Sequence, residues 1–155
     1  MRLSELIGRN GDAARIDILG LSSDSRTVRD GYLFAALAGT RNQGADFVSQ
    51  AVARGAVAVL ADPRAQIAEQ DIYVVTDPNP RRRLALMAAR FFGVQPETVV
   101  AITGTNGKSS VADFVRQLWV ISGLRSASIG TLGIRASGLA TAPTLTTPDP
   151  IEIHA

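Results

Sequence analysis

The segment that most limits the possible folds is VVAITGTNGKSS, residues 99–110. It begins with an apolar run of buried-strand length, continues through a turn flanked by Gly104 and Gly107, and ends in residues that open a helical pattern. Glycines let the backbone approach an anion closely, and the free N–H groups of a helix amino terminus point at it. The segment therefore predicts an α/β protein with a phosphate-binding loop.

Lysine usage supports this interpretation. Lys and Arg together number 16, and Lys108 is the only lysine among them. An ammonium is a compact point charge whereas a guanidinium is planar and forked, so a position that keeps lysine indicates a small cation fitted against a ligand. We expect Lys108 to act on the transferred phosphate, and Ser109 or Ser110 to ligate Mg²⁺. The predicted nucleotide-binding residues are Gly104, Thr105, Asn106, Gly107, Lys108, Ser109 and Ser110.

The spacing of this loop departs from the common eight-residue phosphate loop. That loop would place a glycine at position 102, where this chain has Ile102, so the pattern here is the shorter GxxGK[ST] form. The alternative interpretation is a helix amino terminus with a lone lysine beside it. A further alternative is a different phosphate-loop phosphotransferase, such as a small kinase.

Strand-like and helix-like segments alternate along the chain, which favours α/β layers. With 155 residues the chain has room for one ordinary domain or two small ones. We predict a small α/β domain over residues 1–95, followed over 96–155 by the start of a P-loop-type parallel-sheet ATPase domain. The expected helices are 3–7, 45–54, 81–92 and 109–122, and the expected strands are 15–21, 32–37, 56–60, 72–76, 98–103 and 125–130.

Composition removes several classes of protein. Cysteine is absent and there is 1 histidine, which excludes disulfides and thiolate sites and argues against a histidine zinc site. A net charge of +2 offers little attraction for nucleic acid. No apolar run approaches the roughly 18 residues that a membrane-spanning helix needs. We expect a cytoplasmic protein with neither nucleic-acid nor membrane partners.

Several segments resemble one known family. The loop GTNGKSS, with its shorter spacing, resembles the ATP loop of the Mur ligase family. SSDSR at 22–26, DGYLFAALAG at 30–39 and GADFVSQAVARGAVAVLAD at 44–62 are similar to the uridine-nucleotide domain of its MurE branch. GTLG at 130–133 and LTTPDP at 145–150 are also MurE-like, so the resemblance covers nearly the whole chain.

The resemblance implies a set of substrate-binding residues. These are Ser23, Ser25 and Arg26 of the SSDSR turn, Thr40, Arg41 and Asn42 of a second uridine-site loop, and Thr146 and Thr147 against the muramoyl peptide. The second loop departs from the His-Gln-Ala type known in some members. Serines 109 and 110 replace the more familiar threonine pair and keep the hydroxyl ligands.

The implied activity is ATP-dependent ligation in peptidoglycan synthesis. Such an enzyme adds the third amino acid, diaminopimelate or lysine, to UDP-N-acetylmuramoyl-L-alanyl-D-glutamate through an acyl phosphate. The family's carbamylated lysine and amino-acid-binding domain have no counterpart here, so we expect the front portion of a monomeric ligase, inactive alone. A MurF-type ligase and a stand-alone uridine-nucleotide-binding module are the alternatives.

Overall fold

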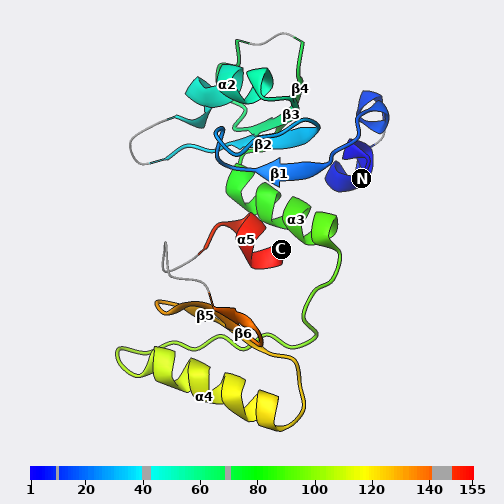
Figure 1. Cartoon of the computed structure of the whole chain (residues 1–155). Helices are drawn as coiled ribbons and strands as arrows, with labels where there is room; N and C mark the ends of the chain where they lie inside the picture. Colours follow the sequence, from blue (N-terminus) through cyan, green and yellow to red (C-terminus); the bar gives the residue numbers. More distant parts are fainter. Residues whose placement is uncertain (10, 40–42, 69–70, 141–147) are drawn as a thin grey trace. The chain divides into compact units, whose positions relative to one another are not determined.

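The computed structural model describes residues 1–9, 11–39, 43–68, 71–140 and 148–155 (Figure 1). These residues form two compact units. The first comprises Met1–Gln95 together with Pro150–Ala155, and the second comprises Pro96–Asp149. The assignment of residues 1–95 and 96–155 to two domains with different functions stays a prediction.

A four-stranded parallel sheet forms the centre of the first unit. The strands lie in the order of the chain, β1 beside β2, β2 beside β3 and β3 beside β4. They are β1 (Gly20–Ser22), β2 (Tyr32–Ala36), β3 (Ala56–Ala61) and β4 (Tyr73–Thr76). Parallel strands covered on both faces are continuous apolar runs, which is why residues 32–37 and 56–60 predicted strands correctly. The α/β class predicted from the sequence is confirmed.

Helices cover both faces of this sheet, with α2 on one face and α3 on the other (Figure 1). The short helix α1 and the helix α5 pack on the same side as α3. The helical segments are α1 (Leu3–Ile7), η1 (Asp12–Arg15), η2 (Gly44–Phe47), α2 (Val48–Ala53), α3 (Pro80–Phe92) and α5 (Pro150–His154). Among the helices of the described residues, none combines the length and the apolar character that spanning a bilayer requires.

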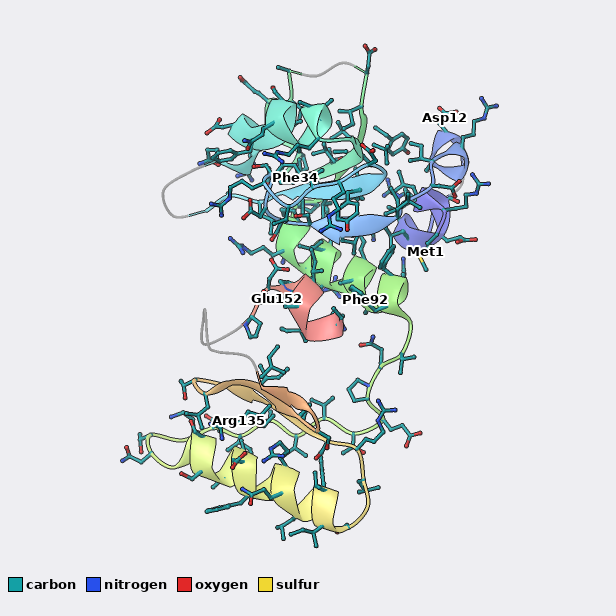
Figure 2. The ribbon with its side chains drawn as sticks, in the orientation of Figure 1. Met1, Asp12, Phe34, Phe92, Arg135 and Glu152 are labelled. Carbon is teal, nitrogen blue, oxygen red and sulfur yellow. The ribbon has the colours of Figure 1, made fainter. Side chains whose placement is uncertain are left out.

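Alternate residues of the central strands enter two separate cores. In β2, Leu33 and Ala35 face the core beneath α1 and α3, because side chains of a strand point to opposite faces in turn. Phe34 and Ala36 face the other core, and Phe34, 2% exposed, lies between the sheet and α2 (Figure 2). The sheet is therefore fixed in register by burial on both sides.

The ends of α3 follow from local sequence. The side chain of Asn79 accepts a hydrogen bond from the amide of Arg82 at 3.1 Å, and Pro80 occupies the first helical turn. Gly93 follows the last helical residue with φ 77°, a conformation that glycine adopts without strain. These signals explain why the helix predicted over 81–92 is observed nearly unchanged.

The second unit combines α4 (Lys108–Ile121) with an antiparallel sheet. Its strands are β5 (Ala127–Gly130), β6 (Gly133–Ala136) and β7 (Leu139–Ala140), in that order. The prediction that 125–130 is a parallel strand is wrong, because β5 and β6 are joined by only two residues and Gly130 pairs with Gly133. A connection this short makes a hairpin, whereas parallel strands need a long crossover.

Two apolar features of the second unit are exposed, and one of them is a segment that the sequence predicted to be a strand. Residues 98–103 form no strand in the described part of the chain, and Val99 and Val100 are 78% and 52% exposed. Phe114, in the helix predicted over 109–122, is 63% exposed. A strand needs a neighbour for its backbone groups, and none of the described strands pairs with this segment.

Candidate functional site

The SSDSR segment forms a closed turn directly after β1. Ser22, 5% exposed, contacts the hydroxyl of Thr27 through Oγ at 2.8 Å. The same Oγ donates to the carbonyl oxygen of Asp24 at 2.8 Å and accepts from the Asp24 amide at 3.0 Å. The side chain of Ser22, the last residue of β1, therefore stabilises the turn through these contacts.

Asp24 and Arg26 form an ion pair on this turn. The Arg26 guanidinium lies 2.7 Å from Oδ2 of Asp24 through Nη2 and donates from Nε to Oδ1 at 3.0 Å. This side-chain hydrogen bond is the main cause that lowers the pKa of Asp24 below its ordinary value, and the backbone amide of Arg26 adds to it. Arg26, predicted as a substrate ligand, thus has its charge largely offset by Asp24.

Ser25 is buried, whereas its neighbours Asp24 and Arg26 are half-buried and exposed. It is 5% exposed, and its hydroxyl donates to Oε1 of Gln50 on α2 at 2.6 Å. Ser23 is half-buried beside it. Sequence reasoning missed Gln50, because the bond joins residues 25 positions apart and no local pattern marks it.

The second predicted uridine segment follows the neighbouring strand. Thr40, Arg41 and Asn42 lie outside the described residues, as do Thr146 and Thr147. Just before the gap, the carbonyl oxygen of Ala38 accepts a hydrogen bond from Nη2 of Arg81 at 2.8 Å. The loop that begins at Leu37, after the end of β2, is called the β2 loop. Since β1 and β2 are parallel neighbours, the SSDSR turn and the β2 loop leave the same edge of the sheet.

The predicted phosphate loop precedes α4 in the second unit. Gly104 has φ 149° and Gly107, the residue before the helix, has φ 77°. Within the described residues no side chain caps the amino terminus of α4, so the amides of its first turn have no capping side chain there. Lys108 Nζ lies over the loop and donates to the carbonyl oxygens of Gly104 and Thr105, at 2.5 Å and 3.3 Å.

The two serines of the loop differ in their surroundings. The hydroxyl of Ser109, half-buried, contacts the hydroxyl of Thr131 in the β5–β6 turn at 2.9 Å, whereas Ser110 is exposed. Thr105 and Asn106 are also exposed. A magnesium nucleotide needs hydrogen-bond donors for its phosphates and oxygen ligands for the ion. The loop offers backbone and helix amides and one ammonium for the phosphates, and two hydroxyls for the ion, and its geometry leaves these groups accessible. The loop therefore fits such a ligand.

Asp113 on α4 accepts hydrogen bonds from its own helix and lies near one arginine of the hairpin. Asp113 accepts from Nε of Arg116 at 3.0 Å and from the Gln117 amide at 2.7 Å, and Arg135 of β6 lies 4.0 Å away (Figure 2). The Arg116 hydrogen bond is the main cause that lowers the pKa of Asp113. The carboxylate of Asp113 therefore has its hydrogen-bond donors on α4 itself and one longer ion pair to β6.

Comparison with known proteins identifies the family of the chain. The family model "Mur ligase family, catalytic domain" matches residues 17–96, and "Mur ligase middle domain" matches residues 102–155. The 2,6-diaminopimelate ligases for UDP-N-acetylmuramoyl-L-alanyl-D-glutamate of Brucella melitensis and Bradyrhizobium diazoefficiens are 46% and 48% identical to this chain over 99% of it. This chain spans only 32% of either relative.

Solved structures give the same result. A structure of a 2,6-diaminopimelate ligase superposes with a TM-score of 0.80 at 26% identity, over 99% of this chain and 32% of that protein. MurF ligase from Thermotoga maritima, solved in complex with ADP, gives 0.53 at 30% identity, over 72% of this chain and 24% of its own. With one family model covering more than half of its length and a second following it in order, the chain belongs to the Mur ligase family.

Proposed function

We propose that this chain is part of an ATP-dependent ligase that adds 2,6-diaminopimelate to UDP-N-acetylmuramoyl-L-alanyl-D-glutamate in peptidoglycan synthesis. The observation that carries the proposal is the identity of 46% to 48% over 99% of the chain with two ligases named for that reaction. Those names favour diaminopimelate over lysine, which the sequence alone left open. The proposal places the enzyme in the cytoplasm, because the reaction consumes ATP.

A MurF-type ligase is the less favoured alternative. The superposed 2,6-diaminopimelate ligase covers 99% of this chain with a TM-score of 0.80, whereas the MurF from Thermotoga maritima covers 72% with 0.53. The two enzymes differ in the group they add. The MurE-type reaction is therefore the one to test first.

In this proposal the first unit binds the uridine nucleotide at the carboxyl edge of its parallel sheet. Ligands of such sheets bind outside the carboxyl ends of the strands, where neighbouring loops meet. Ser23 and Ser25 follow β1 and the 40–42 segment follows β2, which pairs with β1. The backbone amides of the turn suit the carbonyls of uracil and the oxygens of a diphosphate, and a serine hydroxyl can accept from a donor group of the nucleoside.

The second unit would bind ATP with Mg²⁺ at residues 104–110. Lys108 would hold its ammonium against the terminal phosphates, and the uncapped first turn of α4 would donate amides to their oxygens. Ser109 and Ser110 would offer hydroxyl oxygens to the ion, which neutralises phosphate charge when bound. The Thr131 contact would hold Ser109 in place while it does so.

These residues act on the charge that develops during phosphoryl transfer. ATP would phosphorylate the D-glutamyl carboxylate, and the amine of the incoming amino acid would then displace phosphate. Lys108 would stabilise the transferring group electrostatically, since a fixed cation in such a site contributes more to the transition state than to the substrate. Nothing in this role requires Lys108 to lose its proton.

The exposed apolar surface of the second unit is assigned to further protein of the same ligase. Val111, Phe114, Leu118 and Ile121 recur at helical spacing on α4 and are 47%, 63%, 61% and 81% exposed. A stripe of this kind is normally buried in a folded domain. We assign it to the remainder of the middle domain, in keeping with the 32% of the relatives that this chain spans. The chain alone is therefore expected not to ligate.

Calorimetric titration of the chain tests the binding part of the proposal. UDP-N-acetylmuramoyl-L-alanyl-D-glutamate and UDP are expected to bind saturably, with MgATP weaker or absent because the second unit is incomplete. Strong MgATP binding without uridine binding would instead indicate an unrelated phosphate-loop protein. For the full-length ligase, ATP-dependent incorporation of diaminopimelate, and not of lysine or D-alanyl-D-alanine, is the expected result.

A further inference from the structure

Gln50 links the predicted uridine site to a second element of the fold. It lies on α2, and its Oε1 accepts the hydroxyl proton of Ser25 at 2.6 Å. Ser25 belongs to the turn after β1, whereas α2 lies between β2 and β3. The bond therefore ties a candidate ligand-binding side chain to a helix that packs on the sheet through Val48 and Ala51.

The SSDSR turn does not need Gln50 to keep its shape. Ser22 Oγ already bonds to the backbone and side chain of the turn, at Asp24 and Thr27. The Asp24 carboxylate also accepts from the backbone amide of Arg26 at 2.9 Å. What Gln50 adds is a fixed direction for the hydroxyl of Ser25.

That direction decides the chemistry Ser25 presents. A serine hydroxyl has one proton and two lone pairs. Because its proton is directed to Gln50, Ser25 meets a ligand as a hydrogen-bond acceptor. In a uridine nucleotide the matching donors are the imide N–H of the base and the ribose hydroxyls. A phosphate oxygen, which only accepts, would not match.

We propose that Gln50 is a positioning residue for nucleotide binding, which acts by holding Ser25 as an acceptor toward a donor group of the nucleoside. The inference rests on the proposed uridine site. It extends that site from the turn itself to α2. Gln50 needs no contact with the ligand in this role.

A double-mutant cycle on the 155-residue chain tests the inference. UDP binding is measured by calorimetry for Gln50→Met, Ser25→Ala and the double variant, with thermal unfolding recorded for each. Loss of one neutral hydrogen bond is expected to weaken binding roughly threefold to tenfold. The double variant is expected to bind no more weakly than Ser25→Ala, since Gln50 acts through Ser25.

Two further variants separate positioning from a general effect on stability. Gln50→Glu keeps an acceptor oxygen for Ser25 and is expected to bind uridine, which carries no charge, as well as the unaltered chain does. Gln66→Met makes the same chemical change as Gln50→Met on an exposed loop and is expected to bind UDP normally. If Gln50→Met unfolds, the Glu variant and Ser25→Ala decide the question.

The outcomes are distinguishable. If the unaltered chain binds no uridine ligand, the proposed function fails, and this inference with it. If the chain binds UDP and Gln50→Met binds it equally well, only the inference fails. Additive losses in the cycle, or loss of uridine binding in Gln50→Glu at an unchanged unfolding temperature, would also overturn it.

Discussion

Gly44, the first residue of η2, is expected not to tolerate a side chain. A Cβ placed there would lie 2.4 Å from the carbonyl carbon of Ala36 and 2.4 Å from the amide nitrogen of Leu37. Both atoms are backbone at the end of β2, which pairs with strands on both sides and has little freedom to shift. The start of η2 must therefore move instead.

The size of this effect follows from the distances. An ordinary contact begins at 3.4 Å, so Gly44→Ala demands a displacement of about 1 Å. Overpacking of this kind lowers the free energy of unfolding by roughly 1–3 kcal/mol. Alanine also reduces the conformational entropy of the unfolded chain, which offsets about 0.4–1 kcal/mol of that loss. In a unit of this size a net loss of about 1–2 kcal/mol lowers the melting temperature by roughly 5–15 °C.

Differential scanning calorimetry of the chain measures this shift. The matched control is Gly130→Ala, where a Cβ would meet nothing within 4 Å and the backbone needs no glycine. That control is expected to melt within about 2 °C of the unaltered chain. An equal melting temperature for Gly44→Ala would refute the reasoning, because it would mean that the backbone of β2 yields freely.

Three other perturbations are expected to have separate effects. Lys108→Ala should reduce ligation by the full-length protein at least a hundredfold or so, while UDP binding, measured by calorimetry, is unchanged; loss of both would contradict two separate sites. Leu84→Ala, at a position 0% exposed, should destabilise the first unit by about 2–5 kcal/mol in urea unfolding, and a change below that range would mean that the core collapses around the gap. Because Arg26 lowers the pKa of Asp24, their pair stabilises the fold above pH 3.8, and this contribution is lost as the pH falls through the lower folded-state pKa. Arg26→Ala should therefore destabilise near neutral pH and lose its effect in acid, and an NMR titration should show the Asp24 pKa rising; an unchanged pKa would exclude the pair.

Much of the fold was predictable because its signals are local. The helix of residues 80–92 begins with a capping asparagine and ends at a glycine, and the strand at 56–61 is one apolar run. The helix predicted over 109–122 was equally predictable, since the glycine turn and the start of the helical pattern lie next to one another, and the binding of phosphate by residues 104–110 stays a prediction. Patterns confined to a few neighbouring residues therefore gave the correct elements.

The errors concern partners that lie far along the chain. Residues 15–21 read as one strand, but the amide of Leu3 donates to Ile16 and the amide of Ile18 to Met1, so only the last part joins the sheet. The contacts of Ser25 with Gln50 and of Ser109 with Thr131 span 25 and 22 residues. Periodicity reports whether a segment can form an element, and it does not report which backbone or side chain will pair with it.

The sequential order of the four parallel strands has a consequence for synthesis of the protein. As the chain leaves the ribosome, each new strand can add to the one made just before it, so the sheet can grow at a single edge. The helix α2 emerges before β3 and can shield one face early. The opposite face has only the short helix α1 to cover it until α3 follows β4, so its apolar residues are the ones left most accessible to a chaperone during translation.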